Sequence, residues 1–229
     1  MSDTPKDTFT TLGGRLILTN TTPRPTEDPL WLTAFIPPLP AGSRVLDAGT
    51  GSGIAALSLL RRQPHIYAEA ADIDPTLTAL AQANAHLNDL PLIVHTADIL
   101  TTAPLGHYDA ILSNPPFHAE DRGHTTPDAA KQQAHTLPAG DLPRWLTALT
   151  HMLTPTGSLH LILHSACQAE LTTFAHTHGM MLHLTPLQSS ESRPPKRLLA
   201  LLERADTPTI HHHPAIPTYD PALRQTHLT

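Results

Sequence analysis

The sequence is poor in several residue types that would point to particular classes of protein. It has one cysteine, Cys167, in 229 residues, which excludes a disulfide framework and any zinc site built from cysteines. Only 4% of the residues are aromatic, so an aromatic side chain within a motif is a candidate for function. No apolar run approaches the roughly 18 residues that a membrane-spanning helix needs. The N-terminus lacks the basic and apolar regions of a signal peptide, so we expect a cytoplasmic protein with no membrane partner.

Basic residues are also few. The chain has 14 lysines and arginines against 20 acidic residues, and its formal net charge is −6 at pH 7. A protein that binds nucleic acid through the phosphates usually has a basic surface, so the composition by itself does not favour RNA binding. The 17 histidines become cationic only as the pH falls toward about 6. On this ground, a small molecule or a protein is an equally compatible substrate.

The sequence does contain enough apolar residues for a core. Hydrophobic residues make up 40% of the chain and charged residues 15%, and the length suits one domain with small appendages. Proline-rich breaks lie near residues 37–42 and 208–222. We therefore expect an N-terminal segment (1–40) that covers a cofactor site, a main domain (41–205) and a Pro/His-rich C-terminal tail (206–229).

Between the two breaks, short apolar runs alternate with segments of helical composition. Strands are expected over 44–46, 66–73, 92–95, 108–112 and 158–163, with a closing hairpin over 180–187 and 197–202; helices are expected over 30–36, 54–62, 75–87, 142–153 and 166–178. The third of these helices has Asp74 as a suitable N-cap and Pro75 in its first turn. Strands that alternate with helices predict an α/β fold with a mainly parallel sheet.

A glycine-rich turn follows the first of these strands, with the sequence Asp47-Ala48-Gly49-Thr50-Gly51-Ser52-Gly53. At a strand-to-helix junction, such glycines let the backbone approach a ligand closely. The dinucleotide pattern G-x-G-x-x-G fails because its sixth position is Ile54. Asp47 would repel a pyrophosphate but would suit a positively charged amine, and S-adenosylmethionine has one beside its sulfonium. The alternative is a structural turn in which Asp47 caps a helix.

Two further acidic residues follow later strands. Asp72 ends the second strand about 20 residues after the glycines, where a carboxylate can accept hydrogen bonds from both ribose hydroxyls of a cofactor. Asp98, followed by Ile99, comes after the third strand, near where an adenine would lie in an open α/β sheet. Asp98 alone is a weak signal. The glycine-rich turn and Asp72 together favour a bound nucleoside over a purely structural turn.

The sharpest motif is Ser113-Asn114-Pro115-Pro116-Phe117, at the end of the fourth strand. The prolines remove two N–H donors, which leaves the Asn114 side-chain oxygen and the Pro115 carbonyl as acceptors. A planar NH2 group can donate both protons to this pair, so that its nitrogen moves toward tetrahedral geometry and aims at a sulfonium methyl. This is catalysis by orientation and electrostatic complementarity. Phe117 would stack on the planar group, for about 1–3 kcal/mol with a nucleobase. The alternative is a tight turn.

Three motifs in order carry a resemblance to a known family: Asp47-x-Gly49-x-Gly51-x-Gly53, Ala71-Asp72-Ile73-Asp74-Pro75 and Asn114-Pro115-Pro116-Phe117. Over roughly residues 12–203, the chain resembles class I S-adenosylmethionine-dependent methyltransferases of the N-P-P-[FY] group, which methylate planar NH2 groups. The resemblance implies a Rossmann-like, seven-stranded, mostly parallel sheet with an antiparallel last strand and helices on both faces. It implies a cofactor site made of Asp47, Ala48, Gly49, Gly51, Gly53, Asp72, Ile73, Asp98, Ile99 and Asn114. It also implies catalysis by Asn114, Pro115, Pro116 and Phe117, without a metal.

Three branches of that group differ in the methyl acceptor. Residues 12–16, 195–199 and 214–220 resemble bacterial tRNA(Val) adenine-N6 methyltransferases, and we favour this branch because its marks occur at both ends of the chain. Residues 113–118 also resemble ribosomal-RNA guanine-N2 methyltransferases, and residues 22–27 resemble release-factor glutamine methyltransferases, whose substrate is a protein. The guanine-N2 enzymes usually carry a second domain, for which we expect no room in this chain, and the separate N-terminal helical domain of the release-factor enzymes is missing. The favoured branch is usually basic, whereas this chain is acidic.

Two other classes stand beside the methyltransferase. A nucleotide-binding module without catalysis would have no need of the acceptor-rich turn, and an NAD-dependent oxidoreductase is disfavoured by Ile54. Consecutive histidines in an extended segment point to opposite faces, so we expect residues 211–213 to form a solvated tail and no metal site. Trp31 and Trp145 are predicted to be core residues because they lie on apolar helix faces.

Overall fold

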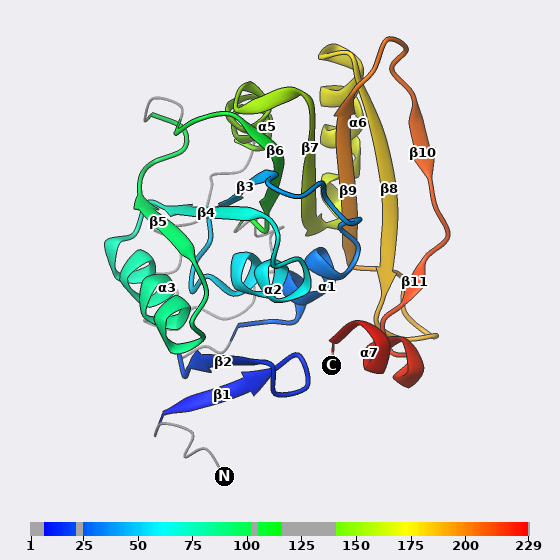
Figure 1. Ribbon diagram of the computed structural model, residues 1–229. Coiled ribbons are helices and arrows are strands. Elements are labelled where there is room, and N and C mark those ends of the chain that lie inside the picture. Colours follow the sequence, from blue (N-terminus) through cyan, green and yellow to red (C-terminus); the bar gives the residue numbers. More distant parts are fainter. Residues whose placement is uncertain (1–6, 22–24, 102–104, 116–140, 229) are drawn as a thin grey trace, which may run out of the picture.

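The computed structural model describes residues 7–21, 25–101, 105–115 and 141–228. They form a two-stranded hairpin and a large sheet with helices on both faces (Figure 1). The strands are β1 (Thr8–Thr11), β2 (Leu16–Thr19), β3 (Arg44–Ala48), β4 (Tyr67–Asp72), β5 (Leu92–Thr96), β6 (Tyr108–Ser113), β7 (Leu153–His164), β8 (Met180–Gln188), β9 (Arg197–Arg204), β10 (Ile210–His212) and β11 (Ile216–Pro217). The helices are α1 (Asp28–Ala34), α2 (Ile54–Arg62), α3 (Pro75–Leu87), α5 (Leu142–His151), α6 (Gln168–Thr177) and α7 (Pro221–Leu228), with a 3-10 turn over Ser165–Cys167.

Within the described residues, the large sheet has nine strands in the order β10-β8-β9-β7-β6-β3-β4-β5, with β11 also paired to β8. Strands β3 to β7 pair in parallel, and β9 is antiparallel to both β7 and β8. The seven expected strands and the antiparallel last member, β9, are therefore present, and β10 and β11 are two short additions. Because parallel strands end at the same edge, the carboxyl ends of β3, β4, β5 and β6 lie together.

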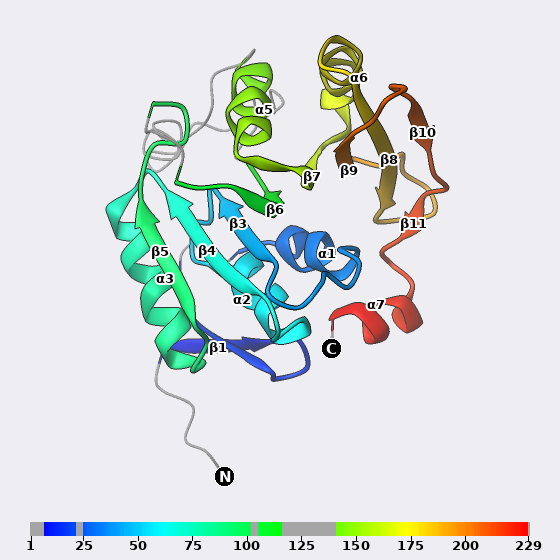
Figure 2. The same ribbon diagram turned by 45° about the horizontal axis from the view of Figure 1, so that its top comes forward.

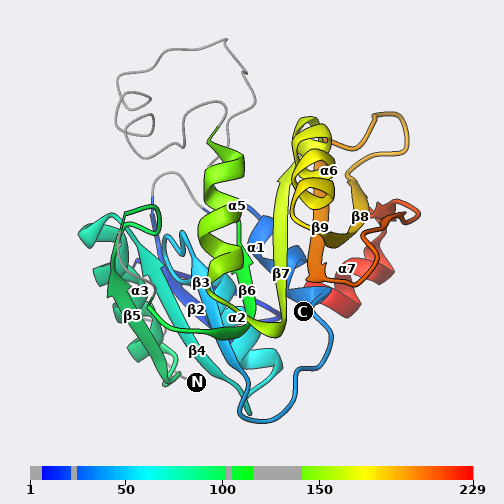
Figure 3. The same ribbon diagram turned by 90° about the horizontal axis from the view of Figure 1, so that it is seen from above.

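Two hydrophobic clusters cover the two faces of this sheet. One packs α1 and α2 with the hairpin against the sheet, and the other packs α5 and α6 on the opposite side. Figures 2 and 3 show α1, α2 and α3 on one face and α5 and α6 on the other. Trp31 belongs to the first cluster and Trp145 to the second, and both are buried, which confirms that they are core residues.

Local sequence explains how the helices next to the glycine-rich turn begin. Asp74 is the N-cap of α3, and its carboxylate accepts a hydrogen bond from the Thr76 amide at 2.7 Å. Gly53 precedes α2 with a φ of +82°, which favours glycine. A Cβ on Gly53 would lie 3.1 Å from the Cβ of Ala81, so this glycine also allows α2 and α3 to approach each other closely.

One boundary differs from the sequence expectation. The helix predicted over 142–153 ends at His151, and the strand expected to begin at residue 158 already begins at Leu153. The pairing of β7 with β6 is irregular between Tyr108 and Ala110. Gly157 permits this irregularity, because a Cβ there would lie 2.8 Å from the Tyr108 carbonyl oxygen. Pro155 and Gly157 therefore mark an irregularity inside β7 and do not mark the end of α5.

The C-terminal segment was expected to be a solvated tail, and its backbone is instead paired to the sheet. Strands β10 and β11 run parallel to β8, and α7 contacts α1 (Figure 1). The side chains of residues 211–213 are exposed. His211 nevertheless stacks on His183 of β8, with ring centroids 4.7 Å apart, and the Nε2 of His213 lies 2.9 Å from the Nδ1 of His183.

Candidate cofactor and acceptor site

The carboxyl ends of four neighbouring strands bring most of the predicted site residues to one edge of the sheet. The structure describes Asp47, Ala48, Gly49, Gly51 and Gly53 at the end of β3, Asp72 and Ile73 at β4, Asp98 and Ile99 after β5, and Asn114 and Pro115 after β6. Pro116 and Phe117 lie outside the described residues. The order β6-β3-β4-β5 places the acceptor-rich turn next to the glycine-rich turn, which in turn neighbours Asp72.

The glycine-rich turn is anchored to the end of β4. The amides of Gly49 and Thr50 both donate to the carbonyl of Ala71, at 2.9 and 3.0 Å. Gly49 and Gly51 have φ angles of +72° and +54°, a left-handed conformation that favours glycine. A Cβ on Gly51 would meet no heavy atom within 4 Å. The turn is therefore held in one shape, with open space beside Gly51 where a ligand can lie against the backbone.

Asp47 lies beneath this turn and is 2% exposed. Its Oδ2 accepts hydrogen bonds from the Thr50 hydroxyl at 2.6 Å and from the Ala56 amide, in the first turn of α2, at 3.0 Å. Burial raises the pKa of Asp47 to about 6; the two hydrogen bonds lower it, and the nearby charge of Asp72 raises it further. The contacts are those of a residue that fastens a turn to a helix start, and its attraction for a cation stays a prediction.

Asp72 holds the turn from the other side and is partly exposed. Its Oδ2 accepts from the Gly51 amide at 2.9 Å, and its Oδ1 accepts from the Asp74 amide at 3.0 Å. A carboxylate has about four acceptor positions, so two remain for further donors such as ribose hydroxyls. Beside it, Ile73 is 54% exposed and offers an apolar surface to a planar base. The contact with ribose stays a prediction, and the geometry leaves room for it.

Asp98 is engaged within its own loop. Its Oδ1 accepts from the Leu100 amide at 2.9 Å, and its Oδ2 accepts from the Thr101 hydroxyl at 2.8 Å. These are the bonds by which aspartate stabilises a turn after a strand. Ile99 is buried, at 8% exposed. Asp98 therefore has a structural task of its own, and its contact with an adenine stays a prediction.

Ser113, directly before Asn114, links the acceptor-rich turn to the glycine-rich turn. Ser113 is fully buried, and its hydroxyl donates to the carbonyl of Ala48 at 2.6 Å. The indole N–H of Trp145 in α5 donates to the same hydroxyl oxygen at 3.2 Å. Asn114 is half-buried and Pro115 is buried. No role was predicted for Ser113; its signal is a polar residue directly after the buried apolar run 110–112 of β6.

Two buried asparagines of the α3 segment tie the N-terminal hairpin to this site. The Oδ1 of Asn84 accepts from the amide and the hydroxyl of Thr19, and its side-chain N–H donates to the carbonyl of Ser52, each at 2.9 Å. Asn88 exchanges hydrogen bonds with both backbone groups of Ile17. The end of β2 is thus held at the glycine-rich turn. This bridge was not predicted from the sequence; its signal is an amide side chain, Asn84, among the apolar residues of the α3 helix.

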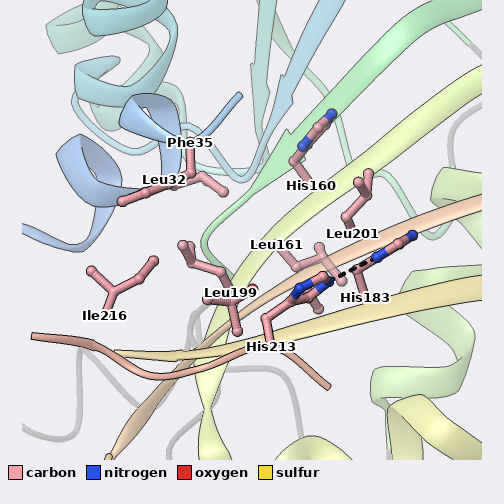
Figure 4. Close-up of a pocket in the computed structure, with 11 residues that line it drawn as sticks. Leu32, Phe35, His160, Leu161, His183, Leu199, Leu201, His213 and Ile216 are labelled. Carbon is pink, nitrogen blue, oxygen red and sulfur yellow. Dashed lines mark hydrogen bonds between the residues drawn. The ribbon is translucent and has the colours of Figure 1, made fainter. Parts of the chain in front are cut away.

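A separate groove lies on the α1 face of the sheet (Figure 4). Leu32 of α1 and Phe35, which follows the helix, face His160, His183 and Leu199 across a cavity of about 220 Å³. His160 is buried, and burial lowers its pKa to about 4. None of the predicted site residues lines this groove. Among the described residues, no group of three His, Cys, Asp or Glu side chains is placed to hold a metal ion, and no helix is long and apolar enough to cross a membrane.

Comparison with known proteins identifies the family. Residues 31–173 match the family described as "Methyltransferase small domain". The chain belongs to this family. A tRNA1(Val) (adenine(37)-N6)-methyltransferase from Porphyromonas gingivalis is 32% identical over 206 residues, which cover 80% of this chain and 78% of that protein. The protein of the same name from Tolumonas auensis is 34% identical over 179 residues, which cover 75% and 73%.

Solved structures share the fold. A predicted O-methyltransferase from Agrobacterium tumefaciens superposes with a TM-score of 0.70 at 16% identity, over 87% of this chain and 95% of that one. TrmN from Thermus thermophilus superposes with a TM-score of 0.53 at 24% identity, over 77% of this chain and 47% of that one. The predicted fold class and enzyme class are confirmed: this methyltransferase has the class I fold and uses S-adenosylmethionine as methyl donor.

The described residues fit that cofactor in charge and shape. S-adenosylmethionine carries an ammonium and a sulfonium, and the charge of Asp72 lies close enough to Asp47 to raise the pKa of Asp47. The open space beside Gly51 and the exposed side chain of Ile73 complete a surface for a nucleoside. That the cofactor lies across the ends of β3, β4 and β5 stays a prediction; the strand order puts the acceptor-rich turn on the adjoining end of β6.

Proposed function

We propose that this methyltransferase acts in the cytoplasm and methylates the exocyclic N6 of an adenine in tRNA. The observation that carries the proposal is the acceptor-rich turn, Asn114-Pro115, which is hydrogen-bonded through Ser113 to Ala48 of the glycine-rich turn. That turn suits a planar NH2 group. Relatives of 32% and 34% identity, named as tRNA adenine-N6 methyltransferases and matched over most of both chains, support adenine over glutamine or guanine as the methylated group.

The proposed chemistry depends on orientation by the protein. When bound, S-adenosylmethionine supplies an electrophilic methyl group. The Asn114 side-chain oxygen and the Pro115 carbonyl accept the two amine protons and direct the nitrogen lone pair. The nitrogen exchanges one proton for the methyl group, and that proton leaves to water. Because the nitrogen becomes positive along the way, both hydrogen bonds strengthen most in the transition state.

An acidic chain can still bind RNA where its few cations gather. The loop between β8 and β9 carries Arg193 and Lys196, both exposed. This loop lies at the catalytic edge of the sheet, because the Ser165 amide, just beyond the carboxyl end of β7, donates to the Lys196 carbonyl at 3.0 Å. We propose that these two cations contact phosphates next to the target adenine.

We also propose that the N-terminal segment (1–40) covers the cofactor bound to the main domain (41–205), because the Asn84 bridge ties the end of β2 to the glycine-rich turn.

The acceptor is tested with labelled S-adenosylmethionine and three substrates in separate reactions: unmodified tRNA, ribosomal RNA and release factor. We expect label in tRNA, recovered as N6-methyladenosine after digestion to nucleosides. Label in release factor alone would move the protein to the glutamine branch, and label in guanosine would move it to the guanine branch. Asn114→Ala should lower kcat by about 10²–10³ with little change in melting temperature. A normal kcat in that variant would refute the orientation mechanism.

A further inference from the structure

The backbone pairing between β3 and β6 ends two residues before Gly49 and two residues before Asn114. Its last backbone pair is Asp47 with Leu112, so the next two residues, Ala48 and Ser113, lie where the strands separate. At this point the Ser113 hydroxyl donates to the Ala48 carbonyl at 2.6 Å. A side chain thus continues the connection after the backbone pairing has stopped. It joins the residue before Gly49 to the residue before Asn114.

Trp145 fixes the direction of this hydroxyl. Because the indole N–H donates to the Ser113 oxygen, the hydroxyl proton is left to point at the Ala48 carbonyl. The six-membered ring of the same indole packs against the cofactor turn, 3.7 Å from where a Cβ on Gly49 would lie. One side chain of α5 therefore contacts the turns at the ends of both β3 and β6. Ser113 is fully buried and Trp145 is 7% exposed, so water does not compete for these bonds.

The glycine-rich turn also has anchors that do not involve Ser113. The amides of Gly49 and Thr50 donate to the Ala71 carbonyl, and the amide of Gly51 donates to the Asp72 carboxylate. Loss of the Ser113 hydroxyl would therefore leave the cofactor turn folded and able to bind its ligand. What it would loosen is the distance between the two turns.

We propose that Ser113, oriented by Trp145, is a positioning residue that sets the spacing between the methyl donor and the acceptor amine. The proposal rests on the proposed function, in which the cofactor lies on the glycine-rich turn and the amine on Asn114. Methyl transfer needs the reacting atoms about 3–3.5 Å apart and aligned, and a misplacement of about 1 Å can cost about 100-fold in rate. The Ser113 link holds two turns in register without touching either ligand.

The test separates kcat from binding. In Ser113→Ala, kcat should fall about 10- to 100-fold, whereas the Kd for S-adenosylhomocysteine and the KM for the acceptor should stay within about twofold of wild type. Trp145→Phe keeps an aromatic side chain but removes the N–H donor, so it should also lower kcat. The two effects should not fully multiply in the double variant, because the lost N–H acts through the same hydroxyl. Ser113→Thr, which keeps the hydroxyl, should restore most of the lost rate.

Ser58→Ala is the matched control. The Ser58 hydroxyl lies 2.8 Å from the Thr33 hydroxyl, both residues are buried, and neither belongs to the two turns. This variant should lower the melting temperature about as much as Ser113→Ala while leaving kcat unchanged. If Ser113→Ala and Ser58→Ala have equal kcat values, or if Ser113→Ala raises the Kd for S-adenosylhomocysteine in proportion to its loss of rate, the positioning role is refuted.

Failure of the proposed function gives a different pattern. If Asn114→Ala retains a normal kcat, the acceptor-rich turn is not where the amine binds, and the proposed function fails. If instead Asn114→Ala is impaired and Ser113→Ala is normal, the site is correct and only the positioning role fails. The assays use whichever acceptor the labelling experiment identifies, so an error about the acceptor does not mask either result.

Discussion

Burial opposes the negative charge of Asp47, and the resulting loss of stability of the folded protein can be measured. Burial raises its pKa from an ordinary 3.8 to about 6. Between these values the folded protein binds more protons than the unfolded chain, so the free energy of unfolding falls as the pH rises from about 4 to 6. A shift of about two units corresponds to roughly 3 kcal/mol. Above pH 6, this cost is present in full.

Asp47→Asn removes the charge and keeps a side-chain oxygen that can accept from Thr50 and Ala56. The variant should therefore be more stable than wild type at pH 7, by up to about 3 kcal/mol, and equal to it near pH 4. Urea denaturation at several pH values measures the difference, and other titrating groups cancel between the two proteins. An asparagine variant that is less stable at pH 7 would show that the two hydrogen bonds to the carboxylate outweigh the cost of burying its charge.

The same residue links cofactor binding to pH. A cationic ligand near Asp47 lowers its pKa, so binding releases a proton when the pH is near 6. The affinity for S-adenosylhomocysteine, whose amine is also cationic, should rise between pH 5 and 7 in wild type and stay nearly flat in Asp47→Asn. Titration calorimetry in two buffers of different ionisation enthalpy measures the released proton. Equal pH dependence in the two proteins would remove Asp47 from the cofactor site.

Three further outcomes are expected. Burial holds the pKa of His160 at about 4, below the ordinary 6.5, so His160 should subtract about 3 kcal/mol from the free energy of unfolding as the pH falls through that window, measured in urea titrations as the difference between wild type and His160→Leu. Gly53→Ala should destabilise by about 1–2 kcal/mol in the same assay, because φ is +82° and the new methyl would crowd Ala81. Arg193→Ala and Lys196→Ala should each reduce the salt slope of RNA binding by about 0.7–0.9, and unchanged slopes would show that this loop does not contact phosphates.

The sequence predicted the elements whose signals are local. Helix α2 has the predicted bounds, because a glycine-rich turn precedes a run of alanine and leucine. Helix α3 begins at the predicted cap, because Asp74 and Pro75 act within one turn of chain. The hairpin β1–β2 was not predicted, because its position depends on Asn84 and Asn88, more than 60 residues away. A three-residue strand such as β10 has no periodicity of its own and depends on pairing with β8.

The same distinction between local signals and tertiary packing applies to the candidate site. Asp72 could be placed because the carboxyl ends of parallel strands meet at one edge, a rule that needs only strand order. The burial of Asp47 and its raised pKa could not be read from the sequence, because they depend on how α2 packs over the turn. The link through Ser113 depends on the register of β3 against β6 and on an indole from α5. No pattern in the sequence carries that register.

The pairing of the C-terminal segment with β8 has a consequence for solubility. Buried apolar residues take alternate positions along β8, at Met180, Leu182 and Leu184. Without residues 206–229, the outer backbone edge of β8 would be free. An exposed, apolar edge strand is a template for pairing with another chain. The strands that cover it are short and bear exposed histidines, and Pro217 has no N–H to offer a further strand. By covering the edge of β8, the C-terminal segment disfavours edge-to-edge pairing of the sheets of two molecules.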